Sequence, residues 1–294
     1  MRILHLSDLH LNPNYHKNNI EKTRTALSQA AIDGFDHLII TGDIAHDADE
    51  ASFKIFRDIL KDFNLLDSKK TTVIIGNHDI FGGVYSVKDL INFPERCKKT
   101  NYVDQVLRFV NYYEELFVDC IFPDDKSVFP FAKILDESVL IGINTNDLYS
   151  VLMNPFASNG KVSKQDYENL KFILSDERIV NRKKIVLSHH HFYKNSFEAK
   201  SSSNELWNKI EGYTLKLRGK KKLLKLFKKN NIELILHGHS HENKNYSRLG
   251  INLFNAGGSI DNDDDTSIIV NYLDTDLMKT TSTKLNLELL ELTL

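Results

Sequence analysis

Residues able to bind metals or move protons follow short apolar runs at five places in this sequence. A single Asp or His after a strand is usually a helix cap or a hydrogen-bonded structural residue. Burying five such groups together would be costly without a cation. The runs over residues 3–6, 38–41, 71–75, 184–188 and 233–236 lead to Asp8-Leu9-His10, Gly42-Asp43, Gly76-Asn77-His78-Asp79, His189-His190-His191 and His237-Gly238-His239-Ser240-His241.

The elements that must position these residues alternate between strand and helix patterns, which favours parallel strands covered by helices. In an open α/β sheet ligands bind outside the carboxyl ends of the strands, so the five groups are expected to meet there. Helices are predicted over residues 21–32, 49–63, 103–117, 164–174 and 221–229. Strands are predicted over residues 3–6, 38–41, 71–75, 138–143, 184–188, 233–237, 251–255, 267–273 and 284–292.

The donor atoms in these groups are carboxylate oxygens, an amide oxygen and imidazole nitrogens, with no thiolate. This mixture favours Mn²⁺, Fe or Zn²⁺ over Ca²⁺ and argues against a structural cysteine–zinc site. Seven or eight donors are too many for one ion and suit two divalent ions that share a bridging carboxylate. Gly42, Gly76 and Gly238 each precede a polar group by one residue, where a glycine permits close backbone approach.

Together the five blocks resemble the calcineurin-like metallophosphoesterase superfamily, and within it most closely the bacterial class III cyclic-nucleotide phosphodiesterases. All five blocks are present in order, from residue 8 to residue 241. The resemblance implies an α/β fold, a four-layer α/β/β/α sandwich of two mixed β-sheets flanked by helices. Residues 1–294 are expected to form one domain.

The resemblance also implies a role for each matching residue. His78 is not a ligand in the family; it contacts the phosphate and the leaving oxygen, and Asp79 orients it. His78 would then act as the general acid. Seven residues are metal ligands by this resemblance: Asp8, His10 and His241 for the first ion, Asn77, His189 and His239 for the second, and Asp43 as the bridge between them.

The triple histidine departs from the family pattern, in which proline often follows a histidine pair. We predict that His189 is the ligand because it comes first after the strand, and His190 is the alternative. Side chains in an extended segment alternate in direction, so both should not face the ions. His191 is expected at the rim of the site, where it could touch the substrate.

Residues 81–131 match no motif of the family. Their aromatic residues Phe109, Tyr112, Tyr113 and Phe117 are interpreted mainly as helix packing, and the alternative is an insertion that caps the site.

The predicted function is hydrolysis of phosphate esters, as a phosphodiesterase acting on a small molecule such as a cyclic nucleotide. A nuclease or a nucleotide-sugar pyrophosphatase would use the same site. A nuclease usually needs a basic surface to bind the nucleic-acid backbone, and the net charge of −2 does not indicate one. The third hypothesis, a metal-free scaffold, would be expected to have lost ligands. The sequence does not indicate the oligomeric state.

The remaining features are those of a cytoplasmic protein. The N-terminus lacks the long apolar segment of a signal peptide, and no run of about 18 apolar residues predicts a membrane span. Cys97 and Cys120 belong to no CxxC motif and are expected to be free thiols.

Residues 261–266 lack the spacing of a calcium loop and are interpreted as a solvated turn. The lysines of residues 220–229 are interpreted as the wet face of a helix, with an anion site as the alternative.

Overall fold

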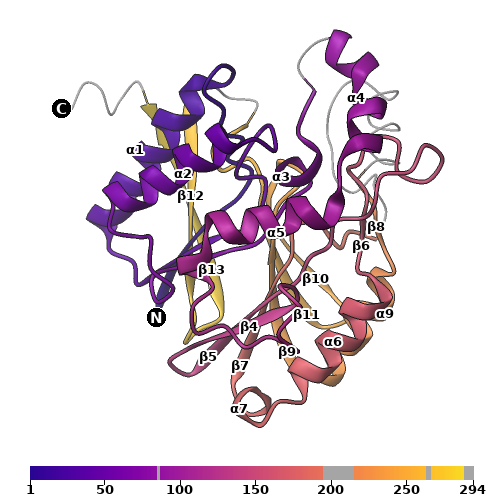
Figure 1. Ribbon diagram of the computed structural model, residues 1–294. Helices are drawn as coiled ribbons and strands as arrows, with labels where there is room; N and C mark the ends of the chain where they lie inside the picture. The colour runs from indigo at the N-terminus through magenta and orange to yellow at the C-terminus, as the bar shows by residue number, and fades with distance from the viewer. Residues whose placement is uncertain (85–86, 195–214, 263–265, 288–294) are drawn as a thin grey trace.

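The structure is a computed structural model that describes residues 1–84, 87–194, 215–262 and 266–287. Two large mixed β-sheets lie in the middle, with α1 (Lys17–Asp33) and α2 (Glu50–Asp62) on one side and α6 (Lys164–Leu174) and α9 (Lys220–Lys229) on the other (Figure 1). The predicted fold class is confirmed. No helix of the described residues is long and apolar enough to cross a membrane.

The first sheet carries three of the five polar groups. Its strands lie in the order β13-β12-β1-β2-β3. The strands β1 (Arg2–Leu6), β2 (His37–Ile40) and β3 (Thr71–Val73) are parallel, so their carboxyl ends lie at the same edge. The two strands β12 (Ser267–Asp274) and β13 (Lys279–Asn286) complete the sheet on the other side of β1, and both pairings are antiparallel.

The second sheet carries the two histidine-rich groups. Its order is β10-β11-β9-β7-β5-β4. The four inner strands β5 (Ser138–Gly142), β7 (Lys183–Leu187), β9 (Ile232–His237) and β11 (Ile251–Ala256) are parallel. The edge strands β4 (Phe131–Leu135) and β10 (Asn243–Arg248) pair antiparallel. The short strands β6 (Gly160–Lys161) and β8 (Leu217–Arg218) pair separately, and α7 (Glu177–Val180) precedes β7.

Apolar side chains fill the space between the layers. One buried cluster joins the first sheet to the second, for example through Leu4, Ile39, Ile185 and Leu236. A second cluster lies between the second sheet and its helices and includes Leu170 of α6 and Leu224 of α9. The lysines Lys221, Lys222, Lys225, Lys228 and Lys229 of α9 are exposed, which confirms the predicted wet face.

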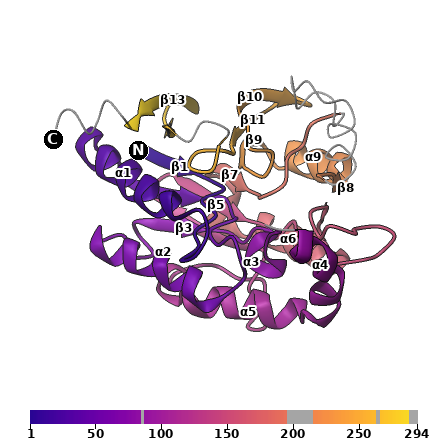
Figure 2. The same cartoon turned by 90° about the horizontal axis from the view of Figure 1, so that it is seen from above.

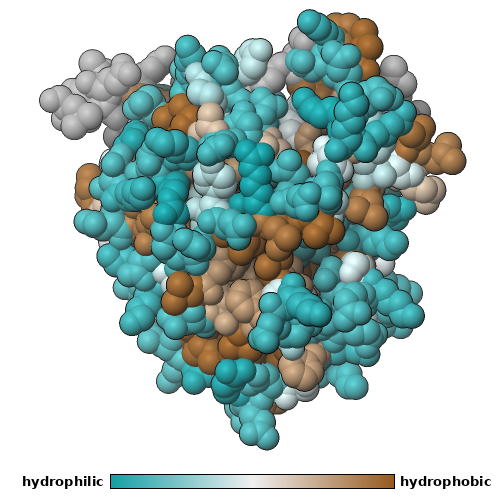
Figure 3. All heavy atoms as spheres, viewed as in Figure 1, coloured by the Kyte–Doolittle hydropathy of each residue, from teal (hydrophilic) through white to brown (hydrophobic). Residues whose placement is uncertain are grey.

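Four elements follow β3: α3 (His78–Phe81), α4 (Val87–Lys99), α5 (Tyr102–Tyr112) and the 3₁₀ turn η1 (Glu114–Leu116). The predicted aromatic packing is confirmed: the rings of Phe109 and Tyr113 lie edge-on to Phe53 of α2, with centroids 5.9 and 6.1 Å away. In the view from above, α4 lies at the opposite end of the molecule from α1 (Figure 2). Below α5, hydrophobic residues gather in the middle of an otherwise mostly hydrophilic face (Figure 3).

Several element boundaries differ from the sequence predictions. The helix predicted over residues 103–117 ends at Tyr112 and continues as η1. The last strand runs from Lys279 to Asn286 rather than over residues 284–292, of which 288–292 lie outside the described residues. Strands β4 and β10 and helix α4 were not predicted. Strand β10 lacks an apolar pattern because it is a polar edge strand, and α4 contains Pro94, which is unusual inside a helix. Both cysteines are free, as predicted.

Candidate metal centre

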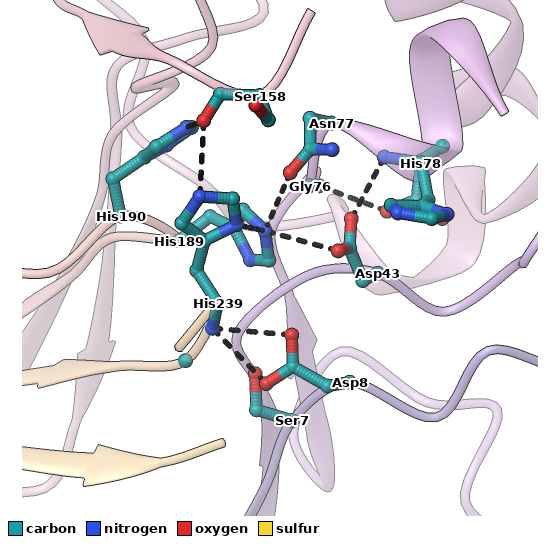
Figure 4. Close-up of polar contacts among 12 residues, drawn as sticks. Ser7, Asp8, Asp43, Gly76, Asn77, His78, Ser158, His189, His190 and His239 are labelled. Carbon is teal, nitrogen blue, oxygen red and sulfur yellow. Dashed lines mark hydrogen bonds and ion pairs between the residues drawn. The ribbon is translucent and has the colours of Figure 1, made fainter. Parts of the chain in front are cut away.

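The carboxyl ends of strands from both sheets meet around His189 (Figure 4). Its Nε2 lies 3.1 Å from the side-chain oxygen of Asn77, 3.1 Å from Nδ1 of His239 and 3.2 Å from Oδ2 of Asp43. Nδ1 of His189 lies 2.8 Å from the carbonyl oxygen of Thr41, which only accepts, so Nδ1 carries a hydrogen. Nε2 can therefore carry at most one further hydrogen, which cannot bond all three neighbours. A cation at this point would satisfy all of them.

His239 is oriented in the same way. Its Nε2 lies 3.0 Å from the carbonyl oxygen of Ser158, so the hydrogen of the neutral ring is on Nε2 and the lone pair of Nδ1 faces His189. The backbone N–H of His239 donates to both carboxylate oxygens of Asp8, each at 3.1 Å, which fixes Asp8 beside this group. Asp43, Asn77, His189 and His239 thus form what we call the second ligand group.

The first ligand group consists of Asp8, His10 and His241, whose potential ligand atoms all lie within 4.8 Å of one another. Nε2 of His10 lies 3.2 Å from Nε2 of His241 and 3.9 Å from Oδ2 of Asp43. Nδ1 of His241 lies 2.9 Å from the carbonyl oxygen of Asp261, so its Nε2 lone pair faces the group. Asp43 therefore lies between the two groups, and the donor set fits two divalent ions.

The structure brings His189, and not His190, to the ligand groups. Both ring nitrogens of His190 have other partners: Nδ1 lies 2.8 Å from the hydroxyl of Thr145 and Nε2 lies 3.2 Å from the carbonyl oxygen of Ser158. The expectation that His191 lies at the rim is wrong. His191 is 2% exposed and packs against Tyr193, whose backbone N–H donates to its Nδ1.

His78 lies beside the first ligand group, with its ring centroid 4.5 Å from that of His10. The expected direct contact with Asp79 is corrected by the structure. Nδ1 of His78 lies 3.1 Å from the carbonyl oxygen of His46, while the Asp79 carboxylate accepts from the backbone N–H groups of Ala45 and Gly76. Asp79 is fully buried and holds the two loops that carry Asp43 and His78.

The backbone at the site has unusual conformations. Five of the seven predicted ligands have positive φ angles, which non-glycine residues adopt at an energetic cost that is typical of functional sites: Asp8 (55°), His10 (46°), Asp43 (51°), His239 (76°) and His241 (47°). Two glycines are required by close approach. A Cβ at Gly76 would lie 2.2 Å from Oδ1 of Asp43, and one at Gly238 would lie 1.9 Å from Oγ of Ser7.

Charge and burial at the site oppose each other. Burial alone would raise the pKa of Asp43, but His189 and His78 hold it well below its usual range. Burial would lower the pKa of His189, but the charge of Asp43 and its hydrogen bond raise it above 6.5. Burial lowers the pKa of His10 and of His239 well below 6.5, so both rings are neutral and able to act as ligands. In the metal-free protein these shifts favour a proton on His189 beside the charged Asp43, and a metal ion would take the place of that proton.

Sequence reasoning missed the groups that orient the ligands. The carbonyl oxygens of Thr41, Ser158, His46 and Asp261 fix the hydrogen positions of His189, His239, His78 and His241 respectively. Backbone carbonyls leave no signal in a sequence, so these partners could not have been identified from residue types.

Comparisons with known proteins identify the family of the chain. The family model of the calcineurin-like phosphoesterases matches residues 1–243. No curated protein matches the sequence. A dimetal phosphatase from Danio rerio superposes with a TM-score of 0.57 at 11% identity, covering 92% of this chain and 91% of that one. Purple acid phosphatase from yellow lupin gives 0.54 at 14% identity, with 97% and 53% covered.

The phosphopantetheinyl hydrolase from Mycobacterium tuberculosis gives a TM-score of 0.50 at 15% identity, with 87% of this chain and 88% of that one covered. At these identities the three structures show a shared fold. The family match covers most of the chain and includes all five polar groups. The chain therefore belongs to the calcineurin-like phosphoesterase family and is a metal-dependent phosphoester hydrolase.

Proposed function

We propose that this protein hydrolyses small phosphodiesters, such as cyclic nucleotides, with two divalent ions held by the two ligand groups. The observation that carries the proposal is the arrangement around His189, where three polar atoms at 3.1–3.2 Å compete for one hydrogen. Mn²⁺, Fe or Zn²⁺ suits these oxygen and nitrogen donors.

Asp8, His10 and His241 would hold the first ion, Asn77, His189 and His239 the second, and Asp43 both. When bound, the two ions would neutralise charge on the phosphate and make water a better nucleophile at neutral pH. The protein contributes rigid support, because His189, His239 and His241 each have the other nitrogen fixed by a backbone carbonyl, and the buried ring of His10 stacks on that of His241.

His78 is proposed to contact the substrate and to protonate the leaving alkoxide. The His46 carbonyl accepts from Nδ1 of His78, which leaves Nε2 for the substrate. The backbone N–H of His78 donates to Oδ1 of Asp43 at 2.8 Å, which ties the position of His78 to the bridging carboxylate. Asp79 is then a positioning residue that acts through the loops it holds.

The charges around the site favour diesters over monoesters. A phosphodiester carries one negative charge, whereas a monoester carries nearly two at neutral pH. Within the described residues, the ion-pair partners of Asp8 and Asp43 are histidines, and no lysine or arginine is paired with either. The carboxylates of the two ligand groups thus have no paired lysine or arginine among the described residues that could meet a second phosphate charge, and Arg96 lies in the wall of the neighbouring cavity.

We further propose that the chain is one domain and that residues 81–131 form one wall of the substrate site. Arg96 of α4 and Gln105 of α5 line a cavity of about 310 Å³ together with Tyr15 and Asp47. Gly83, also in its wall, lies against His46, and the ring of His46 lies 5.1 Å from that of His78. This cavity is suited to the alcohol part of the ester.

The test is a substrate panel with Mn²⁺-loaded protein. We expect bis(p-nitrophenyl) phosphate to have a higher kcat/KM than p-nitrophenyl phosphate, and we expect a chelator to abolish both activities. Cyclic nucleotides, a dinucleotide and a nucleotide sugar identify the natural class. A large preference for the monoester would refute the diester assignment, and full turnover by demetallated protein would refute the two-ion site.

A further inference from the structure

Asp261 begins the segment that sequence reasoning interpreted as a solvated turn, yet it lies against the first ligand group. Its backbone and its side chain both make contacts there. The carbonyl oxygen of Asp261 accepts from Nδ1 of His241 at 2.9 Å, and its N–H donates to the carbonyl oxygen of Asp8 at 3.4 Å. These bonds fix the main chain of Asp261 beside two predicted ligands of the first ion.

The carboxylate of Asp261 also reaches one member of the group, His10. Its Oδ2 lies 3.9 Å from Nε2 of His10, the same distance that separates His10 from Oδ2 of the bridging Asp43. With metal–ligand bonds of about 2.1 Å, two atoms on one ion cannot be more than about 4.2 Å apart. The separation between Asp261 and His10 meets this limit.

The other carboxylate oxygen points toward a second histidine. Oδ1 of Asp261 lies 3.9 Å from Nδ1 of His16, and the Asp261 side chain is 24% exposed. His16 begins α1 in a left-handed conformation with φ of 47°. Asp261 therefore lies between His10 on the buried side and His16 on the solvent side, at the open face of the first ligand group.

We propose that Asp261 is an additional ligand of the first metal ion, beyond Asp8, His10, Asp43 and His241. This inference rests on the proposed two-ion site. The first ion would then have three carboxylates, whereas the second has only Asp43. Carboxylates favour harder cations such as Mn²⁺ and Mg²⁺, while the second group, with two imidazoles but a single carboxylate, suits Zn²⁺. The two positions would accordingly differ in metal preference.

The test measures Mn²⁺ binding to the full chain after chelation, by titration calorimetry, metal analysis and electron paramagnetic resonance. In Asp261→Asn we expect one of two sites to weaken at least about 10-fold, less than for removal of a whole ligand, because the amide keeps a neutral oxygen at this position. The spectrum of two coupled Mn²⁺ ions should be replaced by that of a single ion. The exposed Asp125, in a loop outside both ligand groups, gives the matched control Asp125→Asn.

The variant Asp261→Glu distinguishes loss of the carboxylate ligand from a change in packing at this position, because glutamate keeps the charged group. We expect this variant to retain more of the first-site affinity than Asp261→Asn, and both metal-free variants to melt near the wild type. Equal losses in the two variants, or unchanged binding in Asp261→Asn, would overturn the inference alone. Wild-type protein that binds fewer than two ions would overturn the proposed two-ion site as well.

Discussion

Alanine at His189 and alanine at His190 should cause different kinds of loss. His189→Ala removes a donor that faces Asp43, Asn77 and His239, so the second ion should bind weakly. His190→Ala removes a ring whose two nitrogens bond Thr145 and Ser158, so the ligand groups should keep both ions. The two residues are adjacent, equally buried and chemically identical, which makes each the control for the other.

The magnitudes follow from the contacts. Removing an outer partner of a ligand already costs about 10- to 100-fold in metal affinity, so losing the ligand itself should cost at least about 100-fold, or about 2.7 kcal/mol. The two hydrogen bonds of His190 are worth about 1 kcal/mol each, and the vacated space adds to the loss. A loss of about 3 kcal/mol would lower Tm by roughly 5 °C in a chain of this size.

Metal analysis after dialysis against a weak chelator gives the first quantity, and thermal melting of the metal-free proteins gives the second. We expect His189→Ala to retain about one ion and His190→Ala to retain two with a lower Tm. The reasoning would be refuted if His190→Ala lost an ion while His189→Ala kept both.

Three further predictions concern other parts of the molecule. Asp43→Ala should lose both ions, whereas His78→Ala should keep them and lose about 10²–10⁴-fold in kcat, and a metal-free His78→Ala would contradict the role of His78. Gly76→Ala should lower metal content, because its Cβ would lie 2.2 Å from Oδ1 of Asp43; normal metal content would argue against this crowding. Burial, with the charge of Lys133, lowers the pKa of His37 to about 3, so below pH 6.5 only the unfolded chain takes up this proton. The free energy of unfolding should fall by about 2 kcal/mol between pH 7.5 and 5 on this account, and urea titrations of His37→Gln should show a shallower decrease; equal slopes would contradict it.

Much of the fold could be predicted because the buried parallel strands appear in the sequence as short apolar runs followed by turns that contain glycine. The strands β1, β2 and β3 and the polar residues that follow them are recognisable from local sequence alone. The edge strand β10 was missed because its sequence, NKNYSR, is polar. The segment is extended because it pairs with β11. Tertiary pairing of this kind leaves no periodic signal.

The site shows the same limit. The alternation of an extended chain agrees with the different partners of His189 and His190, whereas the separate prediction that His191 lies at the rim was wrong. His191 is buried because Tyr193 packs on it, a contact that depends on how the chain turns after β7. Asp261 was hidden in a run of aspartates whose composition is typical of a solvated turn.

The position of β12 has a consequence for the protein during its synthesis. β12 forms from residues 267–274, yet it pairs with β1, which is synthesised long before it. Until β12 emerges, β1 has β2 as its one partner in this sheet, and an unpaired strand edge invites aggregation. The strand that precedes Asp8 thus gains its second neighbour only after residues 267–274 have been made. Synthesis that ends before residue 267 would therefore give a chain that contains every predicted ligand. In that chain one edge of β1 would be unpaired beside the first metal site.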